Sequence, residues 1–104
     1  MKNRKISELN LMITRHAAQR ILDRWRIPVN EARTYIERVI CEGSAFLEKK
    51  SGALIFFWNG WKVVLASRNG IDFAVVTIAN DGYYYKEGRL RELKLNVKKI
   101  KWIG

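Results

Sequence analysis

The chain of 104 residues has the length of one domain, and 48% apolar with 12% aromatic residues is the composition of a globular protein. One cysteine and one histidine exclude an internal disulfide and a zinc site made of protein ligands alone. No signal peptide and no apolar run long enough to span a membrane is recognisable in the sequence. We therefore expect a cytoplasmic protein that has no membrane partner.

The formal net charge of +10 is concentrated towards the two ends of the chain. Residues 1–26 hold seven basic and two acidic side chains, residues 27–61 hold four of each, and residues 62–104 hold nine and four. This distribution favours a polyanionic partner, most simply nucleic acid. An acidic protein partner would use the same charge, and a basic protein that its charge merely keeps soluble is the simplest alternative.

Two helices are predicted first along the chain. Thr14 is a natural N-cap for a helix that runs to about Arg26, because the apolar residues after it recur with a helical period. Asn30 can cap a second helix that starts at about Glu31, and Gly43 is where that helix should end.

After Gly43 the pattern changes to runs rich in β-branched and aromatic residues, namely AFLEKK, ALIFFWN, WKVVLAS and IDFAVVTIA. The separators SG, NG and RNG are typical of tight hairpins, so we predict four antiparallel strands in meander order. Residues 89–103 fit both a strand and a helix. We favour a strand, which needs a bulge at Lys98 and Lys99 because the alternation of apolar residues changes parity there.

These elements predict an α+β fold in which two N-terminal helices pack on an antiparallel meander sheet of four to five strands. Residues 1–104 then form a single domain. Its expected parts are a basic N-terminal arm (1–12), a helix–helix–sheet core (13–80) and a basic C-terminal extension (81–104).

The histidine lies on the polar side of the first predicted helix. His16, Arg20 and Arg24 follow one another at four-residue steps and therefore form one ridge, which we call the ridge below. Two guanidiniums at this spacing can hold a phosphate by forked hydrogen bonds, and a histidine beside them is suited to general acid–base catalysis near neutral pH. The simpler alternative is a solvated helix face on which Asp23 and Glu31 neutralise the arginines as surface ion pairs.

The sequence has no P-loop, dinucleotide-binding fingerprint, metal-ligand cluster or recognisable Ser or Cys nucleophile. Cleavage of RNA needs none of these, because the substrate's own 2′-hydroxyl attacks the neighbouring phosphorus and the protein supplies a base, an acid and positive charge. We therefore expect RNA as the partner, with no cofactor and no metal. The candidate catalytic residues are His16, Arg20, Arg24 and Thr77. Thr77 interrupts the apolar run FAVVTIA and could orient a phosphate, although threonine is also an ordinary strand residue.

A second set of side chains is expected to bind nucleic acid. DGYYYKEGR interleaves aromatic and basic residues, as base stacking on single strands requires, and the tail that follows is strongly basic. The candidates are Arg15, Arg68, Tyr84, Lys86, Arg89, Lys94, Lys98, Lys99 and Lys101. For Arg68, in the SRNG turn, an ordinary surface charge is the alternative. Cys41 lies near a helix C-terminus, where the helix dipole does not favour a thiolate, so we expect no reactive thiol.

The stretch ITRHAAQRILDRWRIPVNEARTYIERVICEG, followed by hairpins and FAVVTIA, resembles a family of small bacterial and phage proteins. Their helix opens with Thr/Ser-x-His-Ala-x-x-Arg, and they are grouped with RelE-like toxins in the barnase, colicin and RelE class of metal-independent ribonucleases. The resemblance covers about residues 12–80 and implies a RelE/barnase-like fold. It places the family's histidine on His16, its arginines on Arg20 and Arg24, and its strand threonine on Thr77.

The resemblance also implies partners. A toxin of this kind acts on RNA, either with the ribosome or on tRNA, and is neutralised by an acidic antitoxin. The chain departs from the family at Arg26, where glycine is usual. Two other interpretations stay open. One is a non-catalytic regulator or inhibitor that binds nucleic acid or an acidic host protein, and the other is a structural or assembly protein.

Overall fold

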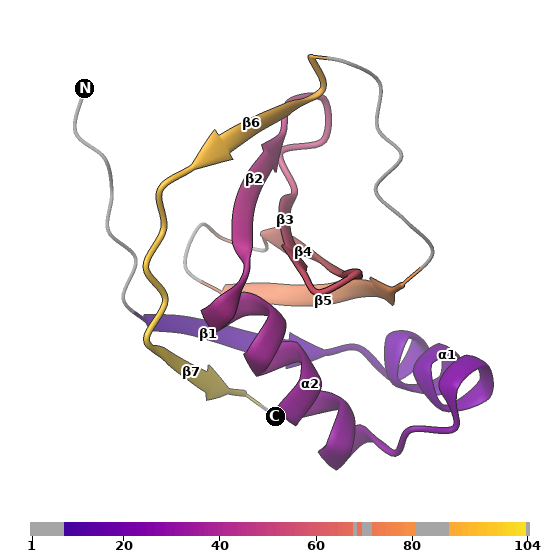
Figure 1. Cartoon of the computed structure of the whole chain (residues 1–104). Coiled ribbons are helices and arrows are strands. Elements are labelled where there is room, and N and C mark those ends of the chain that lie inside the picture. Colours follow the sequence, from indigo (N-terminus) through magenta and orange to yellow (C-terminus); the bar gives the residue numbers. More distant parts are fainter. Residues whose placement is uncertain (1–7, 68, 70–71, 81–87, 104) are drawn as a thin grey trace.

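The computed structural model describes residues 8–67, 69, 72–80 and 88–103. Strand β1 (Glu8–Ile13) comes first and is followed by helices α1 (Arg15–Trp25) and α2 (Val29–Glu42). The later strands are β2 (Ser44–Glu48), β3 (Leu54–Trp58), β4 (Trp61–Ser67), β5 (Asp72–Ala79), β6 (Leu90–Leu93) and β7 (Lys99–Trp102). The seven strands of the described part of the chain form one sheet in the order β6-β2-β3-β4-β5-β1-β7 (Figure 1).

The predicted fold, two helices on an antiparallel meander of four to five strands of RelE/barnase type, is wrong. Strands β2 to β5 do form the expected antiparallel meander. However, β6 extends it at one edge, and at the other edge β1 pairs in parallel with both β5 and β7. The sheet is therefore mixed and has seven strands within the described residues.

The predicted fold is wrong because the two segments expected to be a basic arm and a basic extension contain strands of the sheet. β1 lies in the expected arm, and β6 and β7 lie in the expected extension. In β1, Leu9 and Leu11 are fully buried and alternate with less buried residues, which is the period of a strand. Its partners are far away in sequence, as the pair Asn10–Asp72 illustrates, so no local turn residues announce the pairing.

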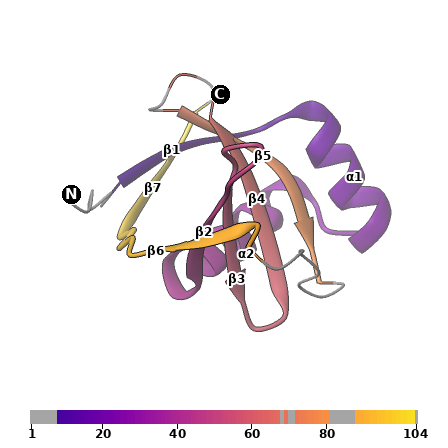
Figure 2. The ribbon, with the colours of Figure 1, turned by 90° about the horizontal axis from the view of Figure 1, so that it is seen from above.

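Both helices pack against one core cluster on one face of the sheet. α2 lies against β3 and β4, and α1 lies against α2 and β5 (Figure 2). The cluster contains apolar side chains from both helices and from five of the described strands, including Leu11, Ile21, Ile36, Phe56 and Val75. The other face also buries apolar side chains, since Ile55 is 1% exposed, as expected from strands that are apolar at both parities.

The ends of the helices follow from local sequence. The hydroxyl of Thr14 accepts a hydrogen bond from the backbone N–H of Ala17 at 3.1 Å, so the predicted N-cap of α1 is confirmed. The predicted cap of α2 is wrong, because the helix starts at Val29 after Pro28 and includes Asn30. Proline suits this place because its fixed φ and missing N–H are both compatible with a helix start.

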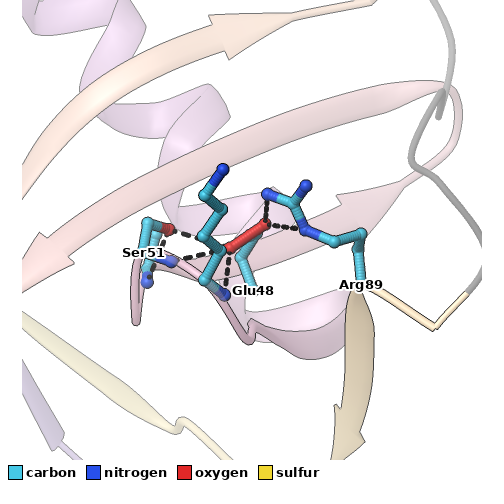
Figure 3. Close-up of polar contacts among 5 residues, drawn as sticks. Glu48, Ser51 and Arg89 are labelled. Carbon is cyan, nitrogen blue, oxygen red and sulfur yellow. Dashed lines mark hydrogen bonds and ion pairs between the residues drawn. The ribbon is translucent and has the colours of Figure 1, made fainter.

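The C-terminal tail contains two short strands separated by residues 94–98, so the favoured strand interpretation is confirmed for part of it. Glu48, at the end of β2, fastens this tail to the sheet (Figure 3). Its Oε1 accepts hydrogen bonds from the backbone N–H groups of Lys50 at 2.6 Å and Ser51 at 2.7 Å. Its Oε2 accepts two from the guanidinium of Arg89, the one from Nε at 2.9 Å.

These contacts keep Glu48 ionised although it is only 5% exposed. The backbone N–H of Ser51 lowers the pKa of Glu48 most, burial opposes this, and Arg89 and the N–H of Lys50 add to the lowering, from the ordinary 4.5 to about 2. Glu48 thus links the turn after β2 to Arg89, the residue before β6, and this contact gives Arg89 a structural role.

Candidate nucleic-acid interface

A pocket lies where α1 meets β5, and it brings together three of the four predicted catalytic residues. Arg20 and Arg24 line it from the helix and Thr77 lines it from the strand. The remaining lining residues are Ala17, Ile21, Trp25, Val76 and Ile78. The lining thus combines apolar side chains with two arginines. Such a mixture suits an anion attached to a less polar group.

A β-bulge shapes the strand side of this pocket. Across β4 and β5, Val64 pairs with Thr77 but Leu65 pairs with Val75, so Val76 is an extra residue without a partner in the register. Val76 is 47% exposed, although its neighbours in β5 are mostly buried. Bulges re-aim side chains and are common beside functional sites. Here the bulge lies in the part of β5 that contributes Val76 and Thr77 to the pocket.

The two arginines of the pocket have no carboxylate partner among the described residues. Asp23, which the simpler interpretation would pair with them, instead accepts a hydrogen bond from the side-chain amide of Gln19 at 2.9 Å. The ion pair found within the described part of the chain joins Arg89 to Glu48, far along the sequence. Within the described part of the chain, no carboxylate therefore neutralises Arg20 and Arg24 at the pocket, and positive charge is what a phosphate site requires.

His16 lies on the ridge but is not one of the residues that line the pocket. It occupies the first turn of α1, one helical turn before Arg20, and it is exposed. Neighbouring positions on a helix face lie about 5–6 Å apart between Cβ atoms. A ligand held by Arg20 could therefore reach His16, although the pocket itself does not enclose the imidazole.

The basic tail lies on the other side of the molecule from the ridge. In both views β7 lies at the left of the molecule and α1 at the right (Figures 1 and 2). The side chains of Lys94, Lys98, Lys99 and Lys101 are exposed. Lysines on an edge strand such as β7 also discourage pairing with other chains, so their position has a structural explanation. The ridge and the tail are thus two separate surfaces.

The other predicted nucleic-acid-binding residues are placed differently. Arg15 is exposed in the first turn of α1, next to His16. Arg89 is the partner of Glu48, which leaves it a structural role. Three more, Arg68, Tyr84 and Lys86, lie outside the described residues.

Aromatic residues near the pocket were not expected to take part in binding. The sequence assigns Trp25 and Trp61 to the core or the sheet surface, yet Trp25 lines the pocket and contacts Trp61. Tyr35, which has helical spacing with buried residues of α2, is 49% exposed. The signal that could have identified Tyr35 is its position at the edge of the apolar arc of α2, beside Trp61 at the β3–β4 hairpin.

Burial raises the pKa of the Cys41 thiol, with smaller contributions in the same direction from Glu37 and Glu42, so the thiol stays protonated at neutral pH.

Arg26, which stands where the family that the sequence resembles has glycine, adopts the left-handed conformation at φ 57° and ψ 32°. Glycine takes that conformation at no steric cost, so the turn after α1 keeps a shape that glycine favours.

No family model matches this chain, and comparisons with curated proteins and with solved structures gave no match either. The resemblance to RelE-like toxins therefore stays a prediction. Within the described residues, no cluster of His, Cys, Asp or Glu could hold a metal ion. Nor does any helix described there have the length and apolar character to cross a membrane.

Proposed function

We propose that this protein binds RNA at the Arg20–Arg24 pocket and cleaves it without a metal ion, with His16 as the general base. The supporting observation is that Arg20 and Arg24, which have no carboxylate partner among the described residues, line one pocket with Thr77, one helical turn from an exposed histidine. The charge distribution along the chain favours the same class of partner.

In the proposed reaction Arg20 and Arg24 bind the scissile phosphate and neutralise the charge that develops on it. His16 removes the proton of the neighbouring 2′-hydroxyl, whose oxygen then bonds to phosphorus. The bond from phosphorus to the 5′-oxygen breaks, and that oxygen takes a proton from water. The hydroxide formed in this way takes the proton from His16, which restores the neutral imidazole. The products are a 2′,3′-cyclic phosphate and a 5′-hydroxyl end. The hydroxyl of Thr77 orients the phosphate by donating a hydrogen bond to it.

The test is incubation of total RNA with the purified protein in EDTA, followed by analysis of the new ends. We expect 2′,3′-cyclic phosphate ends with the wild type and none with His16→Ala purified in parallel, which also controls for a contaminating nuclease. RNA affinity should be nearly equal for both proteins, because His16 is not part of the phosphate contact. Equal cleavage by both, or cleavage by neither, would contradict the proposed reaction.

The second candidate is a non-catalytic protein that binds RNA or an acidic partner. It is favoured by the position of His16 outside the pocket lining. A binder should keep its full affinity for RNA in His16→Ala and show no cleavage in any variant. It should also lose affinity on substitution of tail lysines such as Lys98 and Lys99, with a steep dependence on salt.

A further inference from the structure

Three aromatic side chains from three different elements form a continuous strip. Trp61, at the start of β4, lies between Trp25 of α1 and Tyr35 of α2. The rings of Trp25 and Trp61 meet edge to face with centroids 5.2 Å apart, and those of Tyr35 and Trp61 stack at 6.4 Å with 24° between their planes. We refer to Trp25, Trp61 and Tyr35 as the aromatic strip.

The aromatic strip begins at the phosphate pocket. Trp25 lines that pocket together with Arg20 and Arg24, so the strip adjoins the two arginines of the pocket. Next to the strip, Trp58 is the cross-strand neighbour of Trp61 and has the guanidinium of Arg38 over its ring, 5.7 Å from the centroid. A second cationic group therefore lies beside these rings.

Packing accounts for only part of this arrangement. Trp25, Trp58 and Trp61 are partly buried and pack against the core cluster, which is a sufficient structural reason for their presence. Tyr35 is different, because it is 49% exposed while its ring lies nearly parallel to that of Trp61. An exposed aromatic ring that a neighbouring ring orients is available to stack on a flat ligand.

We propose that the aromatic strip stacks the bases of single-stranded RNA, with Tyr35 as the exposed stacking ring, while Arg20 and Arg24 hold the phosphates of the same strand. Aromatic rings beside a cationic groove are the arrangement that binds single strands, because every base has a face to stack and stacking tolerates any sequence. A duplex keeps its bases stacked on one another and offers no free faces. The inference relies on the proposed function only for the phosphates at the pocket.

The experiment compares two synthetic strands of equal length and charge. One is a short oligoribonucleotide with 2′-O-methyl groups, which cannot be cleaved by 2′-hydroxyl attack, and the other is its abasic counterpart. Dissociation constants are measured by fluorescence anisotropy for the wild type, Tyr35→Ala and Tyr35→Phe. Leu22→Ala is the matched control, because Leu22 is 43% exposed on α1 and lies outside the strip. Thermal melting checks that each variant is folded.

We expect Tyr35→Ala to bind the base-bearing strand roughly 5- to 100-fold more weakly and to bind the abasic strand as the wild type does. Tyr35→Phe and Leu22→Ala should match the wild type on both strands. A Tyr35→Ala loss that is equal on both strands, or no loss on either, would overturn the proposal. So would a wild type that binds neither strand, or a loss of the same size on a duplex.

The same measurements separate this inference from the proposed function. If Tyr35→Ala shows the base-dependent loss but natural RNA is not cleaved, the catalytic proposal fails and the stacking surface stands. If an Arg20→Ala, Arg24→Ala double variant binds the abasic strand as tightly as the wild type, the assignment of the phosphates to Arg20 and Arg24 is wrong, and the stacking surface is unaffected. Affinity that depends on the arginines but not on Tyr35 overturns the stacking surface alone.

Discussion

Removal of the two pocket arginines should change the salt dependence of RNA binding by a calculable amount. Each cation that neutralises one phosphate of a single strand contributes about 0.7 to the slope of log K against log salt concentration. Because Arg20 and Arg24 have no carboxylate partner among the described residues, both are free to make such a contact. The double variant Arg20→Ala, Arg24→Ala should therefore have a slope smaller by about 1.4.

This difference is large enough to measure. Between 50 and 200 mM salt the wild type should lose about sevenfold more affinity than the double variant, since a slope of about 1.4 acts over a fourfold change in concentration. The assay is anisotropy with the uncleavable 2′-O-methyl strand at five or six salt concentrations. Lys50→Ala is the control, because Lys50 is an exposed cation in the turn after β2 and not at the pocket.

A double variant whose salt slope equals that of the wild type would refute the assignment of phosphates to Arg20 and Arg24. A fall in slope of about 0.7 in Lys50→Ala, the value for one phosphate contact, would show that the loss of any cation has this effect. Thermal melting checks that the double variant is folded before its slope is compared.

Three further predictions concern stability. Gly43→Ala should lower the melting temperature by roughly 5–20 °C, because a Cβ there would lie 2.4 Å from the carbonyl oxygen of Phe57. The neighbouring position is exposed, so Ser44→Ala should cost little, and equal melting temperatures of the two variants would contradict this. As the pH falls from 4.5 to about 2, the wild type should lose more resistance to urea than Glu48→Gln, because the lowered pKa of Glu48 stabilises the folded protein only while the carboxylate is ionised. Parallel curves of urea stability against pH for the two proteins would be inconsistent with this. Leu11→Ala should cost about 2–5 kcal/mol in denaturant unfolding, since Leu11 is fully buried in β1, and a loss below about 1 kcal/mol would place β1 outside the core.

The parts of the fold that sequence predicts well are those with a local signal. Thr14 caps α1 by a bond to a residue three positions away, and Gly43 is the C-cap of α2, with its backbone N–H bonded to the carbonyl oxygen of Val39. The four strands after Gly43 are separated by turn residues, of which Asn59 and Gly60 both have the positive φ of a tight hairpin. Each of these features depends on residues close together in the sequence.

The parts that were missed depend on residues far apart. β1 pairs with strands more than 60 residues away, and nothing within Glu8–Ile13 identifies those partners. The bulge at Val76 occurs just before Thr77 interrupts the apolar run, but threonine is an ordinary strand residue and does not by itself indicate an extra residue. For the candidate site, the four-residue spacing found the ridge, but the exclusion of His16 from the pocket depends on how α1 lies on β5. Periodicity alone places Trp25 in the core and gives no hint of the aromatic strip.

The parallel pairing of β1 has a consequence for how the protein is made. A ribosome releases β1 before any other described strand, but its neighbours β5 and β7 follow only after most of the chain has been synthesised. Contacts so distant in sequence slow folding, and until they form, Leu9 and Leu11 belong to an exposed, unpaired strand. The hairpins from β2 to β5 can assemble earlier. The nascent chain therefore depends on β7 to cover the edge of β1, and a chain without Lys99–Trp102 would leave that edge open to pairing with other chains.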